Sequence, residues 1–325
     1  MRTGIVGAGA IGCALAARLA HAGHDVSLVV RKRQRRDALA ADGITCVEAG
    51  ARIEARPRIV EKLPLVRCDV LFLALKAATI SDAVATLPDS IDRDTLIVPL
   101  VNGIPWWFPL DGGAGARPVR AVDPQGALLR RFVPGQIAGS VVYTTAMIVD
   151  SACVRVTRNQ RLILGAIDGR SSDRIAALAA ELSAAGIETS VSDRIRDDVW
   201  TKVALNLATN PLSVVSGAYL GQLCSDPHLE PVVSTILDEV WRVAGRYDAR
   251  PPLTRTEMLD RGRQAGAFRT SMLEDYRAGR PLELDSIADA VFELAAAIGL
   301  DLPISRAIVE LARYRSAAST LPEKI

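Results

Sequence analysis

The chain has 325 residues, of which 49% are apolar and 23% charged, and its net charge is +2. These values describe an ordinary globular protein that is long enough for two hydrophobic cores. A charge this close to zero gives no general attraction to nucleic acid. No stretch reaches the roughly 18 uninterrupted apolar residues of a membrane span. We therefore expect neither nucleic acid nor a membrane as a partner.

Five cysteines and three histidines are scattered along the chain, and no two cysteines form a C-x-x-C pair. This pattern predicts reduced, mostly structural thiols rather than a disulfide framework or a zinc site. The small number of histidines also argues against a histidine-based catalytic triad. We expect no bound metal.

The N-terminal pattern is typical of a dinucleotide-binding unit. A short apolar strand at 3–6 leads into a G-x-G-x-x-G turn, followed by a helix at 13–22 and a second strand at 25–30. In this order of elements the three glycines make the tight turn, admit the pyrophosphate and let helix and strand pack closely. The phosphates would lie at the helix N-terminus. The predicted cofactor-binding turn comprises Gly7, Ala8, Gly9, Ala10, Ile11 and Gly12.

The residue after the second strand indicates which dinucleotide is bound. An NAD site usually places a carboxylate there, whereas an NADP site places an arginine that meets the 2′-phosphate. This chain has Arg31, followed by Lys32 and Arg33, and no carboxylate before Asp37. The sequence therefore predicts NADP(H) as the cofactor, with Arg31 as the principal contact. The alternative is a solvated basic turn.

Two later strands also end in polar residues. The apolar runs at 69–75 and 95–101, separated by a predicted helix at 77–87, are followed by Lys76 and Asn102. Ligands bind outside the carboxyl ends of parallel strands in open α/β sheets. Either residue alone could belong to a turn, but their equivalent positions favour a role for both beside the cofactor.

The aromatic segment that follows Asn102-Gly103 is unusual in a chain with few aromatic residues. It reads I-P-W-W-F and contains Trp106 and Trp107. These rings either form an apolar wall over the nicotinamide or substrate, or pack beneath a loop, and the second interpretation is slightly favoured.

The rest of the chain divides at residue 193. Short strands are predicted within 44–60 and at 119–122, 137–149, 154–156, 162–167 and 187–191, with a helix at 173–185. Strand periodicity then stops, and helices are predicted at 193–209, 226–246, 255–277, 285–298 and 304–316. The predicted fold is α/β: a Rossmann-type dinucleotide-binding domain at 1–192 and an all-helical domain at 193–325.

The first of these helices carries a polar stripe on an otherwise apolar sequence. Lys202, Asn206 and Asn210 are spaced four residues apart and so project from one face. Lysine is rarely buried without a partner, and an unsatisfied buried amide costs about 1–3 kcal/mol. The stripe therefore either forms a structural network with partners or meets a ligand.

Together these motifs resemble the ketopantoate reductase (2-dehydropantoate 2-reductase) family over essentially the whole chain. The generic pieces are the glycine turn, Arg31, L-K at 75–76 and N-G at 102–103. The specific pieces are W-T-K-V-A-L-N-L-A-T-N-P-L-S at 200–213 and S-M-L-E-D-Y-R-A-G-R-P-L-E-L-D-S-I at 271–287. The bulky segment after Asn102-Gly103 departs from the family pattern, which leaves the choice of substrate open.

The resemblance implies a Rossmann domain, a helical domain and an active site in the cleft. The implied reaction is the NADPH-dependent reduction of a 2-oxo acid, 2-dehydropantoate, to pantoate in pantothenate biosynthesis. By position, Lys202 is the catalytic lysine and Glu283 its acidic partner. The remaining implied site residues are Asn206 and Asn210 for the substrate hydroxyl, Ser271 for its carboxylate, and Asn102 and Lys76 near the nicotinamide and the reacting carbonyl.

Protonated Lys202 has the chemistry that this reaction needs, because an ammonium group polarises a ketone and then protonates the alkoxide. Glu283 would orient the lysine or bind the substrate hydroxyl, and its alternative is an exposed carboxylate at a helix end. Two other functions stay open: a paralogue that acts on a different 2-oxo or 2-hydroxy acid, and a non-enzymatic NADPH sensor. The presence of the polar residues named above argues against the sensor, because a sensor does not need a proton donor opposite the nicotinamide. We also expect a cytoplasmic protein and consider a homodimer possible.

Overall fold

The computed structural model describes residues 1–63, 67–110, 117–158, 160–170 and 172–318. The chain forms two compact units, which we call the sheet unit and the helical unit. The sheet unit contains Met1–Val101, Pro105–Pro118 and Gln125–Ile195. The helical unit contains Asn102–Ile104 and Val119–Pro124 as well as the chain from Arg196 onward. The helical unit therefore takes two short segments from the first half of the sequence, and a boundary between residues 192 and 193 stays a prediction.

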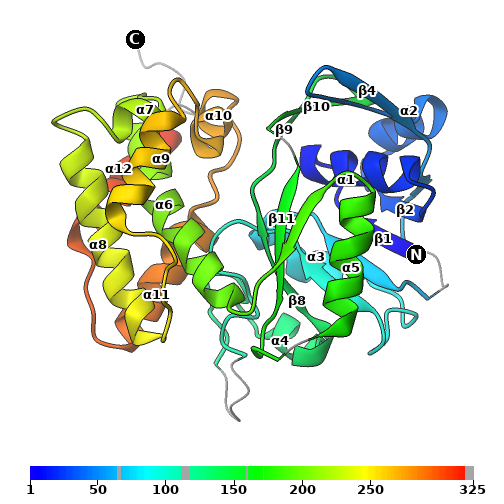
Figure 1. Ribbon diagram of the computed structural model, residues 1–325, viewed down its shortest axis with the longest axis horizontal. Coiled ribbons are helices and arrows are strands. Elements are labelled where there is room, and N and C mark those ends of the chain that lie inside the picture. Colours follow the sequence, from blue (N-terminus) through cyan, green and yellow to red (C-terminus); the bar gives the residue numbers. More distant parts are fainter. Residues whose placement is uncertain (64–66, 111–116, 159, 171, 319–325) are drawn as a thin grey trace. The chain divides into compact units, whose positions relative to one another are not determined.

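A five-stranded parallel sheet forms the centre of the sheet unit (Figure 1). Its order is β5 (Arg58–Val60), β2 (Asp25–Val29), β1 (Arg2–Val6), β6 (Val70–Leu73) and β7 (Leu96–Pro99). The predicted parallel strands are thus confirmed. β2 lies on one side of β1, and β6, which comes later in the chain, lies on the other. The carboxyl ends of β1 and β6 therefore border the crevice where doubly wound sheets bind ligands.

Two helices follow the first two strands along the chain, one after β1 and one after β2. The helix α1 (Ala10–His21) starts inside the glycine turn, three residues earlier than predicted, and Gly9 occupies its N-cap. Every residue from Gly12 to Ala17 is buried, so the helix is covered on more than one side, and it contacts strands of the parallel sheet and of a second sheet. The basic segment after β2 forms the helix α2 (Arg33–Asp42). Arg31 lies between β2 and α2 and is exposed.

Two smaller sheets complete this unit. One has the order β4 (Ala51–Ala55), β3 (Ile44–Glu48), β10 (Cys153–Arg158) and β9 (Thr145–Ile148). The other has the order β12 (Glu188–Val191), β11 (Arg161–Ala166) and β8 (Ala138–Val142). The shorter helices are η1 (Ala77–Thr79), α3 (Ile80–Val84), α4 (Ala127–Arg131) and η2 (Pro134–Gln136), and α5 (Asp173–Ala184) packs on β11 and β12.

Two strand predictions are wrong in this region. The apolar run at 137–149 is not one strand, because the chain leaves β8 and enters β9 of the other sheet after residues 143 and 144. Residues 119–122 form a turn instead of a strand. The N–H groups of Arg120 and Ala121 donate to the Glu293 carboxylate at 2.9 and 3.1 Å. A side chain distant in sequence thus holds this segment.

The described part of the helical unit from Arg196 onward contains helices and no named strand. Its elements are α6 (Ile195–Ser216, whose first residue belongs to the sheet unit), α7 (Leu220–Leu223), α8 (Glu230–Arg246), α9 (Arg255–Gln264), α10 (Ser271–Arg277), the π-helical turn η3 (Asp285–Asp289), α11 (Ala290–Ala297) and α12 (Pro303–Ala318). The single helix predicted at 255–277 is divided into α9 and α10. Gly266, in the left-handed region at φ +58°, lies between them.

The helix α6 runs through Pro211 and ends seven residues later than predicted. A proline inside a helix removes one backbone hydrogen bond and usually costs about 3 kcal/mol. Residues on both sides of Pro211 are core residues, with Leu207 and Val214 fully buried. Tertiary packing therefore overrides the local signal for a helix end.

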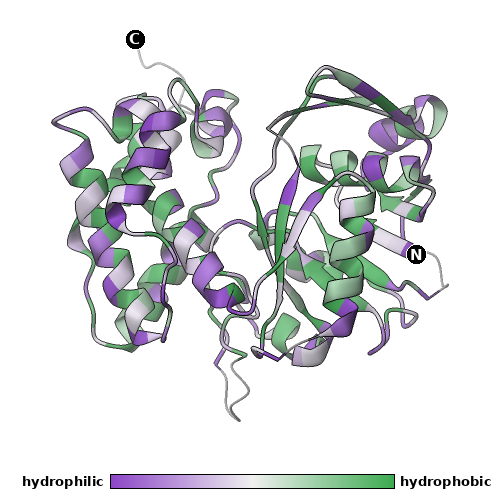
Figure 2. Cartoon of the chain, viewed as in Figure 1, coloured by the Kyte–Doolittle hydropathy of each residue, from purple (hydrophilic) through white to green (hydrophobic). Residues whose placement is uncertain are grey.

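Figure 2 shows how hydropathy alternates along α8, whose apolar residues Val233, Leu237, Val240 and Ala244 are fully buried. A buried carboxylate on the same helix caps α12: Glu239 accepts hydrogen bonds from the N–H groups of Ile304 and Ser305 at 3.0 and 2.8 Å. No helix of the described chain is long and apolar enough to cross a membrane.

Candidate active site

The glycine turn has the backbone that close approach of a phosphate requires. Gly7 has φ +115°, and a Cβ there would overlap the Ala74 carbonyl oxygen. A Cβ at Gly12 would overlap the Gly7 carbonyl oxygen. At Gly9, in contrast, no atom of a described residue beyond its neighbours in the chain lies within 4 Å of the place a Cβ would take. The turn is therefore packed where it meets the protein and open where a pyrophosphate would approach, which fits a dinucleotide.

The basic residues after β2 differ in whether their charged groups already contact other side chains. Arg36 pairs with Glu61 at 3.0 Å, and Arg33 with Asp37 at 3.7 Å. Arg35 reaches back to α1, where its Nη2 lies 3.6 Å from Cys13 Sγ. The side chains of Arg31 and Lys32 are exposed and, among the described residues, have no hydrogen bond or ion pair. These two cations are available for an anionic ligand.

The polar stripe on α6 meets residues from two distant segments, all within the helical unit. Lys202 Nζ donates a hydrogen bond of 2.7 Å to Asn102 Oδ1. Asn102 Nδ2 in turn approaches Glu283 Oε2 at 3.4 Å. Lysine only donates and a carboxylate only accepts, so the amide can serve both partners in one orientation alone. Asn102 therefore bridges the cation and the carboxylate.

These surroundings shift the pKa of the Lys202 ammonium group. Burial lowers the pKa of the Lys202 ammonium group to about 8, and the negative charge of Glu283 opposes this shift. Removing a cation from water disfavours its charged form, whereas a nearby carboxylate favours it. A lysine with this pKa is mostly protonated at neutral pH and also gives up its proton readily, as a general acid must.

The other predicted substrate residues lie in the same unit. Asn206 and Asn210 follow Lys202 on α6, and among the described residues neither side-chain amide has a hydrogen-bond partner. Ser271 is the exposed first residue of α10. Two amide groups without partners among the described residues thus lie on one helix, which favours a ligand over a purely structural network for Asn206 and Asn210.

A buried pair of hydroxyl groups, which the sequence reading did not identify, connects these segments. Ser213 Oγ lies 2.6 Å from Thr270 Oγ1 and also donates to the Asn210 carbonyl oxygen at 2.6 Å. Thr270 is the N-cap of α10 and accepts from the Leu273 N–H. The backbone beside Asn210 is therefore tied to the helix that begins with Ser271. Nothing in the local pattern pairs residues that lie 57 positions apart.

Lys76 lies three residues after β6, and Asn102 three residues after β7, the neighbouring parallel strand. Both strand-end positions are as predicted. Asn102 nevertheless belongs to the helical unit and Lys76 to the sheet unit. The contacts of Asn102 described above are with Lys202 and Glu283, so its side chain joins the candidate catalytic group.

The aromatic segment packs in the interior of the sheet unit. Trp106 and Trp107 are 1% and 0% exposed. The ring centroid of Trp106 lies 5.6 Å from that of Phe132. A Cβ at Gly139 would come within 2.9 Å of the Trp107 ring, so the glycine makes room for it. The interpretation of these residues as packing residues is confirmed.

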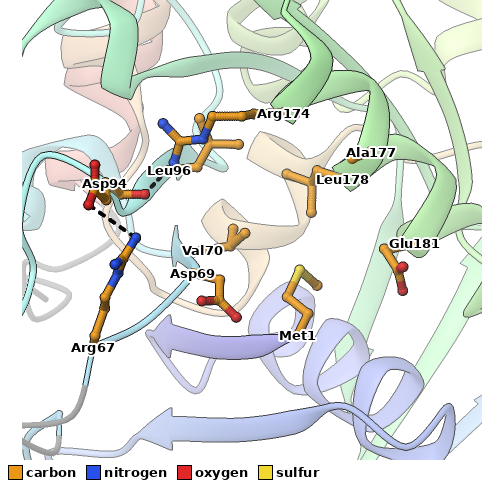
Figure 3. A pocket seen from close by; sticks show the side chains of 10 residues that line it. All are labelled: Met1, Arg67, Asp69, Val70, Asp94, Leu96, Arg174, Ala177, Leu178 and Glu181. Carbon is orange, nitrogen blue, oxygen red and sulfur yellow. Dashed lines mark hydrogen bonds and ion pairs between the residues drawn. The ribbon is translucent and has the colours of Figure 1, made fainter.

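A cavity of about 280 Å³ lies elsewhere on the sheet unit, at the amino ends of β1, β6 and β7 (Figure 3). Its rim is charged. Two of the cationic side chains there already have partners, because Arg67 pairs with Asp94 at 3.2 Å and Arg174 donates to the Asp94 carbonyl oxygen. This edge of the sheet is opposite to the glycine turn. Among the described residues no cluster of histidine, cysteine, aspartate and glutamate could hold a metal ion.

A Rossmann-type unit with an open glycine turn, together with a helical unit that presents a tuned lysine, defines the chain as a nicotinamide-dependent oxidoreductase. Comparison with known proteins identifies the family. The model of "Ketopantoate reductase PanE/ApbA" matches residues 3–169, and that of its C-terminal domain matches residues 194–316. The chain belongs to the ketopantoate reductase family.

Individual relatives agree with this assignment. A 2-dehydropantoate 2-reductase of Mesorhizobium japonicum is 32% identical over 320 residues, which cover 96% of this chain and 97% of the relative. A Ralstonia solanacearum structure assigned to the ketopantoate reductases has a TM-score of 0.90 and 30% identity, with 99% of each chain covered. D-mandelate dehydrogenase, solved with NADH and anilino(oxo)acetate, shares the fold with a TM-score of 0.83 and 21% identity over 99% of this chain and 100% of that one.

Proposed function

We propose that the chain catalyses the NADPH-dependent reduction of 2-dehydropantoate to pantoate in pantothenate biosynthesis. The observation that carries the proposal is the contact of Lys202 with Asn102, which in turn reaches Glu283. Three segments far apart in sequence supply a cation of lowered pKa, an amide and a carboxylate. Family membership adds the expected reaction class.

Lys202 is the proton donor in this proposal. Its ammonium group polarises the ketone oxygen of the substrate and then transfers a proton to the alkoxide that forms. Such a positioned general acid contributes about 10²–10⁴-fold to the rate. Glu283 keeps the ammonium form populated and, with Asn102, orients Nζ. The pKa of about 8 leaves Lys202 charged at neutral pH while making its proton easier to transfer.

Four polar groups remain for the substrate. Asn206 and Asn210 offer amides that can hold a hydroxyl group, and Ser271 offers a hydroxyl and a backbone N–H for a carboxylate. A small 2-oxo acid with a hydroxyl group matches this set. A site built to hydrogen-bond a hydroxyl group discriminates strongly against analogues that lack it.

The open glycine turn and Arg31 support NADP(H) as the cofactor. Gly9 and the N-terminus of α1 would hold the pyrophosphate, and the exposed Arg31 the 2′-phosphate. We assign Lys76 to the nicotinamide end because it follows the strand beside β1. When bound, the reduced cofactor supplies the hydride.

The decisive experiment is initial-rate oxidation of NADPH with ketopantoate, run beside pyruvate, 2-oxoisovalerate and phenylglyoxylate. We expect kcat/KM with ketopantoate of about 10⁴ M⁻¹s⁻¹ or more, and well above the other acids. Faster turnover of a branched or aromatic acid would overturn ketopantoate as the substrate and identify a paralogous 2-oxo acid reductase. Tight NADPH binding without turnover of any acid would contradict the proposed reductase activity and favour a sensor.

A further inference from the structure

Beside the Lys202–Asn102–Glu283 contacts, two backbone segments approach each other unusually closely. The first is Asn102–Ile104, and the second is the π-helical turn η3 that begins two residues after Glu283. The Ile104 N–H donates to the Ser286 carbonyl oxygen at 2.8 Å. Asn102 thus belongs to the first segment, and Glu283 lies two residues before the second, so both lie close in sequence to this hydrogen bond.

Gly103 permits this approach. Its φ is +85°, a region that L-residues with a Cβ rarely adopt. A Cβ at Gly103 would overlap the carbonyl group of Ser286 and come within 2.7 Å of Ile287 N. Both the conformation and the packing therefore require glycine. The contact involves backbone on both sides, so it fixes the spacing of the segments more tightly than flexible side chains would.

The second segment is buried in the helical unit. Ser286, Ile287 and Ala288 are at most 1% exposed. A π-helical turn displaces the backbone hydrogen bonds by one residue and is frequent at functional sites. The buried Ser286 hydroxyl has no hydrogen-bond partner among the described residues, and the contact with Ile104 is made by the Ser286 carbonyl oxygen.

We propose that Gly103 is a positioning residue, and that its backbone contact with Ser286 sets the register of Asn102 against Glu283 and so the placement of the Lys202 ammonium group. The inference rests on the proposed function for its kinetic readout. Asn102 directly precedes Gly103, and Glu283 lies three residues before Ser286. A shift between the two segments therefore moves the acceptor of Lys202 and the carboxylate apart. A misplacement of about 1 Å can reduce turnover by about 100-fold.

The test compares Gly103→Ala with Gly299→Ala. Gly299 also has a left-handed φ, +69°, in the helical unit, but among the described residues beyond its chain neighbours no atom lies within 4 Å of its Cβ position. The control thus carries the backbone strain without the clash. We expect Gly103→Ala to reduce kcat by more than about 10-fold, with unchanged NADPH affinity and binding stoichiometry, and Gly299→Ala to stay within about 2-fold. Equal kcat values in the two variants would overturn the proposal.

A double-mutant cycle separates positioning from general loss of structure. If Gly103 acts through Asn102, Gly103→Ala lowers kcat by less than about 2-fold in an Asn102→Ala background. An undiminished effect in that background would overturn the proposal. Where Gly103→Ala does not fold, Ile104 is replaced by its α-hydroxy acid, which removes only the N–H donor. An unchanged kcat in that ester variant would likewise contradict the role of the contact.

A measurement without substrate distinguishes this inference from the proposed function. Reductive methylation with ¹³C-formaldehyde labels the lysines, and Lys202→Arg assigns the Lys202 signal. Because Glu283 raises the pKa of Lys202, displacing Glu283 in Gly103→Ala must lower that pKa relative to Gly299→Ala. Identical titration curves would overturn the positioning role even in an active enzyme. A lowered pKa in a protein that reduces no 2-oxo acid would support the role and refute only the proposed function.

Discussion

Lys202 Nζ lies 2.7 Å from Asn102 Oδ1, although the two residues are 100 positions apart in the sequence. Asn102 follows the last strand of the parallel sheet, and Lys202 is on the long helix α6. The other atom of the Asn102 amide, Nδ2, approaches the Glu283 carboxylate. This arrangement gives the lysine a fixed acceptor and a compensating charge while it is partly removed from water.

Replacing the lysine tests its chemical role directly. We expect Lys202→Ala to lower kcat by about 10²–10⁴-fold, as for loss of a general acid, with NADPH affinity unchanged. Lys62→Ala, at an exposed position of the sheet unit, is the matched control and should be indistinguishable from wild type. A decrease in kcat of less than about tenfold would show that Lys202 is not the proton donor.

The pH dependence of kcat should follow the ionisation of Lys202. The protonated form is active, and its pKa is lowered to about 8 by burial while Glu283 opposes the shift. Activity is therefore full well below pH 8 and is lost as the pH rises through about 8. Glu283→Gln removes the opposing charge, so the alkaline limb should move to lower pH.

The control for this pH measurement is Glu310→Gln, an exposed carboxylate on α12, which should leave the alkaline limb in place. A limb that stays at the wild-type pH in Glu283→Gln would mean that Glu283 does not act on the lysine charge.

The cofactor preference should depend on Arg31. A hydrogen bond to a charged group contributes about 1.5–3 kcal/mol, so Arg31→Ala should weaken NADPH binding by about 10–100-fold and leave NADH binding nearly unchanged. Fluorescence titration with both dinucleotides measures this. Arg33→Ala, whose guanidinium already pairs with Asp37, should change neither affinity. Equal losses for NADPH and NADH would instead assign Arg31 a general electrostatic role.

The buried hydroxyl pair should matter for both stability and substrate affinity. Ser213→Ala leaves Thr270 without its partner and should lower the free energy of unfolding by about 1–3 kcal/mol. Because the pair connects Asn210 with the start of α10, KM for the substrate should rise as well. Urea unfolding and steady-state kinetics check both effects.

A suitable comparison for Ser213→Ala is Thr235→Val. The Thr235 hydroxyl bonds the Pro231 carbonyl oxygen on the exposed side of α8, and its loss should change stability by less than about 0.5 kcal/mol. If the two variants unfold at the same urea concentration, the buried pair does not stabilise the unit.

The aromatic segment should affect stability rather than specificity. Trp106→Ala removes a buried ring and should cost about 3–5 kcal/mol, visible as a lower Tm. The ratio of kcat/KM for ketopantoate to that for phenylglyoxylate should not change. A changed ratio at unchanged Tm would restore the view that this segment shapes the substrate pocket.

Local pattern was sufficient for much of this molecule. The glycine spacing identified the turn between β1 and α1, and a four-residue period placed Lys202, Asn206 and Asn210 on one face of α6. Arg31 as the contact for a 2′-phosphate stays a prediction. These features depend on neighbours within a few residues, where backbone geometry and side-chain period act directly.

Long-range packing decided what local pattern could not. The continuation of α6 through Pro211 depends on the core on either side, and the division of 137–149 depends on which sheet each half joins. The bridge made by Asn102, the link between Ser213 and Thr270 and the close approach of Gly103 to Ser286 join residues that no period relates. Such contacts form only when the chain folds, because their stabilisation comes from tertiary packing and not from the propensity of any single segment.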